Sequence, residues 1–324
     1  MTREYGGYLP LELPRDRGHF YPSGKNQSVL KLNSGRTAFY CAALDSGMKR
    51  IHLPYFTCEY TRAPFDDLGI EVMEYFIDED FMPKIIGYSE KDYVLWTNYY
   101  GNSSSEIIDI VVQMYPNLVI DNCHAFFSPP IEGVYNCYSL RKFFGVSDGA
   151  YLINSSLFPF DNFEIDQSAT YAQHLIEQID NGTNAGYSAS LNNEERLTGN
   201  YKKMSRFTER VLGTIDYEDV INRRQANFLT YHKNLQHLNL FPINLTSQTH
   251  FYYPFLFEQE NLREKLIKNK VYNPQWWKYL LTKLPESSIE YRLAKFTILL
   301  PLDQRYEPKD IEDICQIVLG CISQ

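Results

Sequence analysis

Hydrophobic and polar positions in the first half of the chain fall into two kinds of segment. Short apolar runs rich in β-branched and aromatic residues predict strands at 50–56, 70–76, 92–100, 118–121, 133–139 and 149–154. Between these runs, apolar residues at helical spacing predict helices over 35–47 and 104–115. Strands that alternate with helices are typical of a mostly parallel sheet covered by helices, so we expect an α/β fold here.

After about residue 155 the pattern becomes that of polar helices. Helical spacing covers roughly 164–240 and is most regular over 214–238, which predicts one long helix there. The remaining apolar runs predict two strands and two helices, at 250–257, 296–302, 260–270 and 308–322. These elements indicate a small C-terminal α+β domain. We therefore expect a large domain over residues 1–210 and a small one over 211–324.

Composition narrows the classes of partner. The chain of 324 residues carries a net charge of −9 and has no run of Lys and Arg, which argues against a nucleic-acid partner. No long apolar stretch predicts a membrane span, and the polar N-terminus shows no signal peptide. The six cysteines are widely spaced, without a Cys-x-x-Cys pair or a metal-binding Cys/His cluster. We expect reduced thiols, no metal and a cytoplasmic location.

The first candidate for chemistry is the stretch "LNSGRTAFYCAAL", in which Ser34 and Gly35 stand at the start of a predicted helix. A helix N-terminus offers unpaired backbone N–H groups and a partial positive charge. Small residues at that point let an anion approach the backbone closely. Taken alone, the two residues are more often an ordinary helix cap.

The second candidate is Asp121, which ends the buried-looking strand over 118–121. In α/β sheets ligands gather at the carboxyl ends of strands, and a carboxylate there can keep the ring nitrogen of a heterocycle protonated. Capping of the next segment is the alternative for Asp121. His124 follows it closely, and by itself such a histidine is more often structural than catalytic.

The third candidate lies in "SLRKFFGVSDGAYL", which runs from Ser139 to Leu152. A predicted strand ends near Ser139, Lys142 follows in a turn, and Gly149 introduces the return strand. A lysine just past a strand end can be held in a site as a nucleophile. Considered alone, Lys142 is more often a solvated surface residue.

The three candidates together are more specific than each of them alone. An anion-binding helix start, a strand-end aspartate and a Ser-x-x-Lys turn follow one another along the chain. Pyridoxal phosphate needs these groups, because it requires a cup for its phosphate, a carboxylate for its pyridine nitrogen and a lysine for its aldehyde. The sequence therefore predicts pyridoxal 5'-phosphate as the cofactor, with Lys142 and Asp121 as the catalytic residues.

In these motifs and others the sequence resembles the sugar aminotransferases of the DegT/DnrJ/EryC1/StrS family over nearly its whole length. "NSGRTAF" is similar to the family's phosphate loop, "IDNCHAFF" to its Glu-Asp-Ala-Ala-His/Gln-Ala segment, and "CYSLRKFFGVSDGA" to its Ser-Phe-x-x-x-Lys and Glu-Gly-Gly segment. The resemblance implies the fold type I, aspartate-aminotransferase-like architecture of pyridoxal-phosphate enzymes. In that architecture a mixed, mostly parallel sheet is flanked by helices and followed by a small C-terminal α+β domain.

The resemblance also assigns roles to single residues. It places Lys142 on the lysine that bonds to the cofactor's aldehyde, Asp121 on the aspartate that faces the pyridine nitrogen, and His124 near the ring's hydroxyl. The residues expected to bind the cofactor are Ser34, Gly35, Arg36, Thr37, Cys58, Tyr60, Asp121, His124, Cys137, Ser139, Lys142 and Asn200.

Three positions depart from the family's pattern. Cys137 stands where the family has a phosphate-binding serine, a role that we expect Ser139 to take over. Cys58 stands near the family's cofactor-stacking aromatic, so Tyr60 or Tyr55 is the expected substitute. Asn200 in "GNYKKMS" is one position out of step with the asparagine that the family supplies to the neighbouring subunit's phosphate.

The resemblance implies a homodimer with shared active sites. It also implies transfer of an amino group, from glutamate, to a nucleotide-linked keto-sugar in surface polysaccharide or related sugar biosynthesis. Dehydratase-like members of the family carry histidine in place of the lysine, and Lys142 argues against that variant. Two alternatives stay open: a pyridoxal-phosphate enzyme that acts on a substrate other than a sugar, and a member that keeps the fold without the activity and serves as a binding partner.

Overall fold

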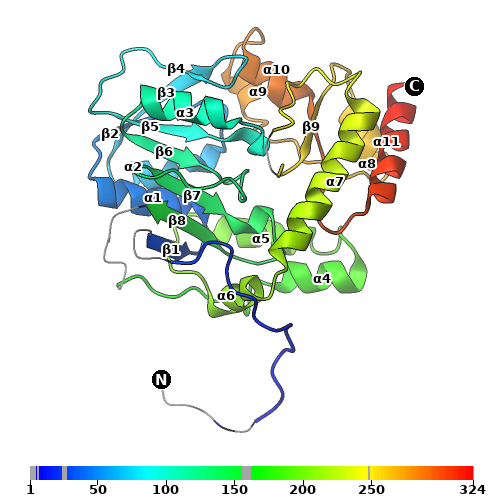
Figure 1. Ribbon diagram of the computed structural model, residues 1–324, viewed down its shortest axis with the longest axis horizontal. Coiled ribbons are helices and arrows are strands. Elements are labelled where there is room, and N and C mark those ends of the chain that lie inside the picture. The colour runs from blue at the N-terminus through cyan, green and yellow to red at the C-terminus, as the bar shows by residue number, and fades with distance from the viewer. Residues whose placement is uncertain (1–4, 6, 24–27, 155–161, 247–248, 324) are drawn as a thin grey trace.

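The structure is a computed structural model that describes residues 5, 7–23, 28–154, 162–246 and 249–323. Its centre is an eight-stranded sheet with the strand order β1-β8-β7-β6-β5-β2-β3-β4 (Figure 1). The strands are β1 (Ser28–Leu32), β2 (Arg50–Pro54), β3 (Glu71–Ile77), β4 (Pro83–Lys84), β5 (Tyr93–Thr97), β6 (Leu118–Asp121), β7 (Tyr135–Ser139) and β8 (Ala150–Asn154). Strands β3, β2, β5, β6 and β7 run parallel, whereas β8, β1 and β4 are antiparallel to their neighbours. This mixed, mostly parallel sheet confirms the expected fold class.

The helices link the strands and flank the sheet. They are α1 (Gly35–Ser46), α2 (Ala63–Asp66), α3 (Ser105–Met114), α4 (Gln173–Asn181), α5 (Tyr187–Arg196), α6 (Arg206–Gly213), α7 (Tyr217–Leu235), α8 (Leu262–Lys268), α9 (Leu280–Lys283), α10 (Ile289–Phe296) and α11 (Pro308–Ile322). Three short 3₁₀ turns join them: η1 (Glu59–Thr61), η2 (Tyr99–Gly101) and η3 (Leu140–Lys142). The predicted helices are confirmed to within a few residues at their ends. In the described part of the chain, no helix has the length and apolar character that a membrane crossing requires.

Successive residues along a central strand point to opposite faces of the sheet, and both faces are covered. On one face Trp96 of β5 belongs to a buried cluster with Val111 of α3. On the other face Leu95 belongs to a buried cluster with Phe39 and Ala42 of α1. β5 and β6 are therefore buried on both sides, which explains why their sequences read as continuous apolar runs.

The parallel strands bring their carboxyl ends to one edge of the sheet. In adjacent strands Thr97 lies opposite Asp121, and Asp121 lies opposite Cys137. Helix α1 begins beside this edge, because a Cβ atom on Gly35 would stand 3.9 Å from the Cβ atom of Ser139. Ligand sites of α/β proteins lie at edges of this kind.

The C-terminal part of the chain forms a smaller unit beside the sheet (Figure 1). There β9 (Tyr253–Leu256) and β10 (Thr297–Leu300) pair antiparallel. One buried cluster joins α7, β9 and α11 through Phe228, Phe255 and Val318. This unit has the helices and strands expected of a small α+β domain, and the division of the chain into two domains near residue 210 stays a prediction.

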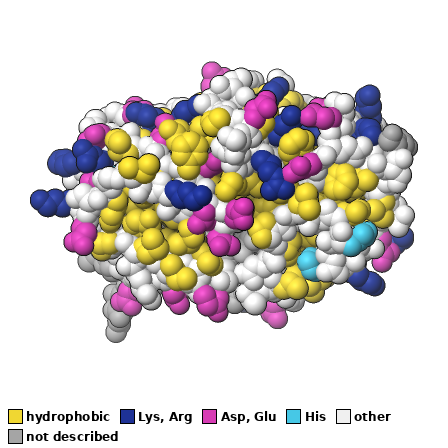
Figure 2. Space-filling model, turned by 90° about the horizontal axis from the view of Figure 1, so that it is seen from above, with side chains coloured by type: hydrophobic (Ala, Val, Ile, Leu, Met, Phe, Trp, Pro, Cys, Tyr) yellow, Lys and Arg dark blue, Asp and Glu magenta, His cyan; other side chains and the backbone are white. Residues whose placement is uncertain are grey.

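The charged side chains are mixed on the face of the molecule that Figure 2 draws. Lys and Arg side chains lie there among Asp and Glu side chains and do not gather by sign. A protein that tracks a phosphate backbone needs a basic stripe. The face drawn in Figure 2 shows no such stripe, and the net charge of the chain is −9.

Candidate active site

A cavity of about 200 Å³ opens at the carboxyl edge of the sheet. Most residues predicted to bind the cofactor line it: Ser34, Gly35, Arg36, Cys58, Tyr60, Asp121, His124, Ser139 and Lys142. They come from the start of α1, from η1, from the ends of β6 and β7 and from η3. The topology thus gathers groups that are up to about a hundred residues apart in the sequence.

The start of α1 forms an open cup at one wall of the cavity. Ser34 caps the helix, and its Oγ atom accepts a hydrogen bond of 3.2 Å from the backbone N–H of Thr37. A Cβ atom on Gly35 would lie 3.0 Å from the Sγ atom of Cys123, so a larger residue there would crowd the loop after β6. The N–H groups of a first helical turn lack intrahelical partners and bind anions. The cup is therefore suited to a phosphate group.

Asp121 is fixed at the end of β6. The side chain is buried, and Oδ1 accepts a hydrogen bond of 2.9 Å from the backbone N–H of Cys123. Because this bond uses one oxygen atom, the carboxylate keeps acceptor capacity toward the cavity that it lines.

Lys142 ends the η3 turn and is half-buried. Its Nζ atom lies 5.4 Å from the ring centroid of Trp276, within cation–π range. The carbonyl of Phe143 accepts hydrogen bonds from Gln304 Nε2 at 2.8 Å and from the buried Arg224 at 3.4 Å. Groups from the C-terminal part of the chain therefore hold the turn that presents the lysine.

His124 lies in a stack of aromatic rings beside the cavity. Its ring centroid is 4.6 Å from that of Trp276 and 5.9 Å from that of Tyr100. Burial, reinforced by the charge of Lys142, lowers the pKa of His124 well below its usual value. The imidazole is neutral at physiological pH, and its buried Nδ1 atom has no hydrogen-bond partner within the described chain.

Arg36 and Arg141 share one carboxylate at the cavity. Glu194 of α5 accepts from Arg36 Nη1 at 2.8 Å and from Arg141 Nη1 at 2.7 Å. Burial alone would raise the pKa of Glu194, but the two guanidinium groups lower it to about 2. Glu194 is therefore charged at neutral pH.

Three predicted residues do not line the cavity. Thr37 is buried under the cup, where its hydroxyl group contacts Ser34. Cys137 is buried inside β7. Asn200 offers its backbone carbonyl to the side chain of Asn33 at 2.8 Å. Within this chain these residues support the cup, and their predicted contacts with a cofactor stay predictions.

The aromatic wall of the cavity differs from the expected one. The ring of Tyr55 packs against Phe76 at 4.7 Å between centroids and does not line the cavity. Cys58 and Tyr60 do line it, together with Trp277, which precedes α9. Trp277 comes from a distant part of the chain, so spacing in the sequence could not reveal it.

Other lining residues were also missed from the sequence: Thr57, Thr61, Arg141 and Glu194. The sequence could have indicated Arg141 as a site residue, because it directly precedes Lys142 in a turn already proposed for the site. No sequence pattern indicated Glu194 as a site residue, because only the packing of α5 brings it to the cavity.

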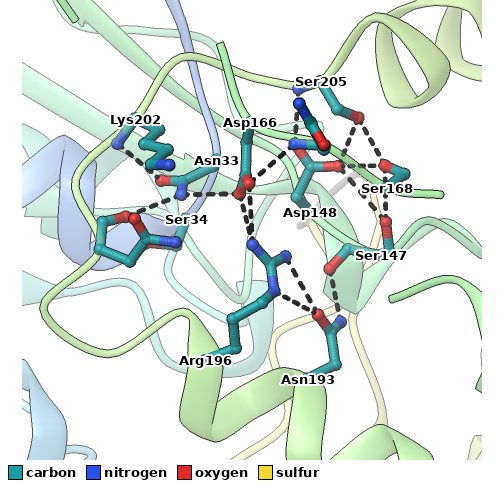
Figure 3. Close-up of polar contacts among 12 residues, drawn as sticks. Asn33, Ser34, Ser147, Asp148, Asp166, Ser168, Asn193, Arg196, Lys202 and Ser205 are labelled. Atoms are coloured by element: carbon teal, nitrogen blue, oxygen red, sulfur yellow. Dashed lines mark hydrogen bonds and ion pairs between the residues drawn. The ribbon is translucent and has the colours of Figure 1, made fainter. Parts of the chain in front are cut away.

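A buried polar network holds the segments behind the cup (Figure 3). The carboxylate of Asp148 is fully buried and accepts hydrogen bonds from Ser205 N at 2.7 Å and from Ser168 Oγ at 3.0 Å, among others. Asp166 pairs with Arg196 at 2.8 Å and accepts from Asn33 at 2.9 Å. Because Asn33 directly precedes the cap of α1, this network fixes the backbone of the cup.

We expect Asp148→Ala to lower the free energy of unfolding by about 3 kcal/mol or more, because it leaves several buried donors unpaired. Urea unfolding followed by circular dichroism measures the change. Asp109→Ala, on the exposed side of α3, is the control and should stay within about 0.5 kcal/mol of the parent. Equal stabilities of the two variants would contradict the role of the network.

No protein-family model matches the chain, and no curated protein matches it in sequence. Its fold matches many solved structures. The Spr1654 protein of Streptococcus pneumoniae, described as a sugar aminotransferase and solved in its PMP form, is 15% identical with a TM-score of 0.64, over 90% of this chain and 87% of that one. A DegT DnrJ EryC1 StrS aminotransferase from Brucella abortus is 12% identical with a TM-score of 0.59, over 90% and 85%.

A third match is the GDP-4-keto-6-deoxy-D-mannose-3-dehydratase of E. coli with bound hydrated PLP, 13% identical with a TM-score of 0.60, over 90% of this chain and 87% of that one. Likenesses at this level of identity establish the fold. The chain therefore has the fold type I architecture of these pyridoxal-phosphate enzymes, as the resemblance in its motifs implied. Fold alone does not fix function, so the activity rests on the site.

Proposed function

We propose that the protein is a pyridoxal-phosphate-dependent aminotransferase that transfers the amino group of glutamate to a nucleotide-linked keto-sugar, in surface polysaccharide or related sugar biosynthesis. One observation carries the proposal: Lys142, Asp121 and the start of α1 line a single cavity at the carboxyl edge of the sheet. Structural neighbours with this fold bind the same cofactor or its amine form. In such a fold, the three groups together point to pyridoxal phosphate more strongly than any one of them does.

The residues fit the cofactor at each of its polar ends. The cup of α1, with Ser139 beside it, suits the phosphate group, and the buried Nε atom of Arg36 has no partner within the described chain. Asp121 suits the protonated pyridine nitrogen, since its carboxylate is buried and already oriented by one hydrogen bond. Lys142 suits the aldehyde, because it lines the cavity and groups from the C-terminal part of the chain hold its turn.

When bound, the cofactor supplies an aldehyde that bonds to amines and a ring that withdraws electrons. With the cofactor bound, Lys142 Nζ would hold the aldehyde carbon and, once an amino donor has taken its place, would move a proton at the reacting carbon of the substrate. Positioned proton transfer of this kind contributes about 10²- to 10⁴-fold in rate. Asp121 keeps a proton on the ring nitrogen, and neutral His124 can hydrogen-bond through Nδ1 without adding charge.

The overall exchange balances without an external oxidant or reductant. The carbon of glutamate that bears the amino group is oxidised to the ketone of 2-oxoglutarate. The carbonyl carbon of the sugar is reduced to a carbon that bears the amino group, and its oxygen atom leaves as water. A different water molecule supplies the ketone oxygen of 2-oxoglutarate. Over one full exchange Lys142 is neither consumed nor changed.

The choice of a sugar substrate is supported by the names of the structural neighbours, which include sugar aminotransferases and a dehydratase of a GDP-linked keto-sugar. Lys142 supports transfer over dehydration, because the family resemblance implies histidine in place of this lysine in dehydratase-like members.

Isotope transfer tests the proposal. The protein, pyridoxal phosphate and glutamate labelled with nitrogen-15 are incubated with a panel of nucleotide-linked 3-keto and 4-keto sugars, and the products are analysed by mass spectrometry. Label in an amino sugar, with one equivalent of 2-oxoglutarate, is the expected result. Label that enters only keto-acids identifies a non-sugar substrate and contradicts the proposal as stated.

The same proposal includes a homodimer in the cytoplasm. Large apolar side chains are exposed near the N-terminus, among them Tyr8, Leu9 and Leu11. A run of exposed apolar residues is a feature of segments that pack on another chain. The six unbonded cysteines agree with a reducing compartment. Sedimentation equilibrium of the full chain should give twice the chain mass, and a monomer would contradict the dimer.

A further inference from the structure

The ion triad of Arg36, Glu194 and Arg141 lies against the cup of α1. Arg36 belongs to the first turn of α1, and Arg141 belongs to the η3 turn that also carries Lys142. Both guanidinium groups line the cavity, and so does Glu194. The start of α1 and the turn after Ser139 therefore each add an arginine to the cavity.

The two arginines have more binding capacity than Glu194 uses. The side chain of Arg36 is only 10% exposed, and that of Arg141 is 17% exposed. In each of them the buried Nε atom has no hydrogen-bond partner within the described chain. Two positive charges face one negative charge, and the nearby helix N-terminus adds further positive potential. The two arginines therefore carry more positive charge and more hydrogen-bond donors than Glu194 alone can satisfy.

Glu194 is the most exposed member of the triad. Its side chain is 41% exposed, whereas the two arginine side chains are largely enclosed. It projects from α5, in which Asn193 is the one buried residue within the described helix. A rotation of the Glu194 side chain can therefore carry its carboxylate into water without disturbing the core, while the arginines stay in place.

We propose that Arg36 and Arg141 form an anion-binding pair for a phosphate monoester, and that Glu194 is an internal carboxylate that occupies this pair until the phosphate displaces it. A dianionic phosphate with three acceptor oxygens offers the pair more charge and more hydrogen bonds than a carboxylate does. That this phosphate is the phosphate group of the cofactor rests on the proposed function. The competition between Glu194 and an anion does not depend on the chemistry of Lys142.

Calorimetric titration of the cofactor-free protein with inorganic phosphate tests the competition. Glu194→Gln keeps the size of the side chain and removes the competing charge, so its Kd for phosphate should be at least tenfold lower than that of the parent. Glu195→Gln removes the same charge from the neighbouring, exposed position of α5 and should leave Kd within about twofold. Arg141→Gln should raise Kd at least tenfold.

An unchanged or weaker affinity of Glu194→Gln for phosphate would overturn the proposal, because Glu194 would then brace the arginines and not compete. In Glu194→Gln the new side-chain amide could still contact the arginines. Glu194→Ala removes that contact, and its affinity for phosphate should rise as that of Glu194→Gln does. Thermal unfolding of each variant confirms that it is folded. Covalent labelling of Lys142 by pyridoxal phosphate is measured separately, so a failure of the proposed activity stays distinguishable from a failure of this inference.

Discussion

Replacing Lys142 with alanine is expected to reduce amino transfer from glutamate by about 10⁴-fold or more. Among the described residues that line the cavity Lys142 is the one lysine, and the proposed mechanism needs its Nζ atom for both the bond to the aldehyde and the proton transfer. Stopped-flow absorbance of the glutamate half-reaction measures the rate directly. The fold should persist, because Lys142 is half-buried and its turn is held through the backbone of Phe143.

Lys278→Ala is the matched control for this variant. Lys278 is exposed and directly follows Trp277, so the substitution removes a nearby positive charge without touching the lining of the cavity. It should leave the rate within about twofold. If Lys142→Ala reacted as fast as Lys278→Ala, another residue would have to move the proton.

The second large effect is expected for Asp121→Asn, which should lower the same rate by about 10²- to 10³-fold. The amide keeps the size of the side chain and can still accept the hydrogen bond from the backbone N–H of Cys123. It cannot supply the negative charge that keeps a ring nitrogen protonated. The absorbance band of the bound cofactor should shift as well. A shifted band shows that the variant still folds and binds the cofactor but has lost the charge beside the ring.

Asp92→Asn is the control for Asp121→Asn, because Asp92 is a buried aspartate that precedes β5 at the opposite end of the sheet. Its Oδ2 atom lies 3.0 Å from Nε2 of the buried His52. The substitution should lower stability but leave the cofactor band and the rate per folded molecule unchanged. Equal kinetic effects of the two variants would show that Asp121 acts only through the fold.

The sequence could predict the central strands because burial on both faces makes each of them a continuous apolar run, as in Leu118–Asp121. It did not predict β1 and β4, which lie at the two edges of the sheet. A short edge strand such as Ser28–Leu32 gains its pairing partner from the fold, here β8, and carries little pattern of its own.

The same contrast holds for the site. Ser34, Asp121 and Lys142 could be predicted because each stands at the start or the end of an element that the sequence itself marks. Glu194 and Trp277 could not, because their places depend on how α5 and the C-terminal unit pack against the sheet. Local pattern fixes the ends of elements, whereas tertiary packing decides which distant side chains complete a cavity.

The role of Asn200, which is shifted by one position from the family's asparagine, could not be inferred from the sequence. The ring of Tyr201 stacks on that of Tyr40 of α1 at 3.9 Å between centroids, and its hydroxyl group donates to Asp67 at 2.5 Å. These contacts hold the segment against α1, where the carbonyl of Asn200 accepts from Asn33. The contact that the family's asparagine makes with a neighbouring subunit stays a prediction for this chain.

The most direct test of the account is the place at which pyridoxal phosphate becomes attached. The protein is incubated with the cofactor, reduced with borohydride, digested with trypsin and analysed by tandem mass spectrometry. One phosphopyridoxyl group per chain is expected on Lys142, with cleavage after that residue blocked and no label in the Lys142→Ala variant. Label on another lysine, or equal label in Lys142→Ala and in the parent, would contradict it.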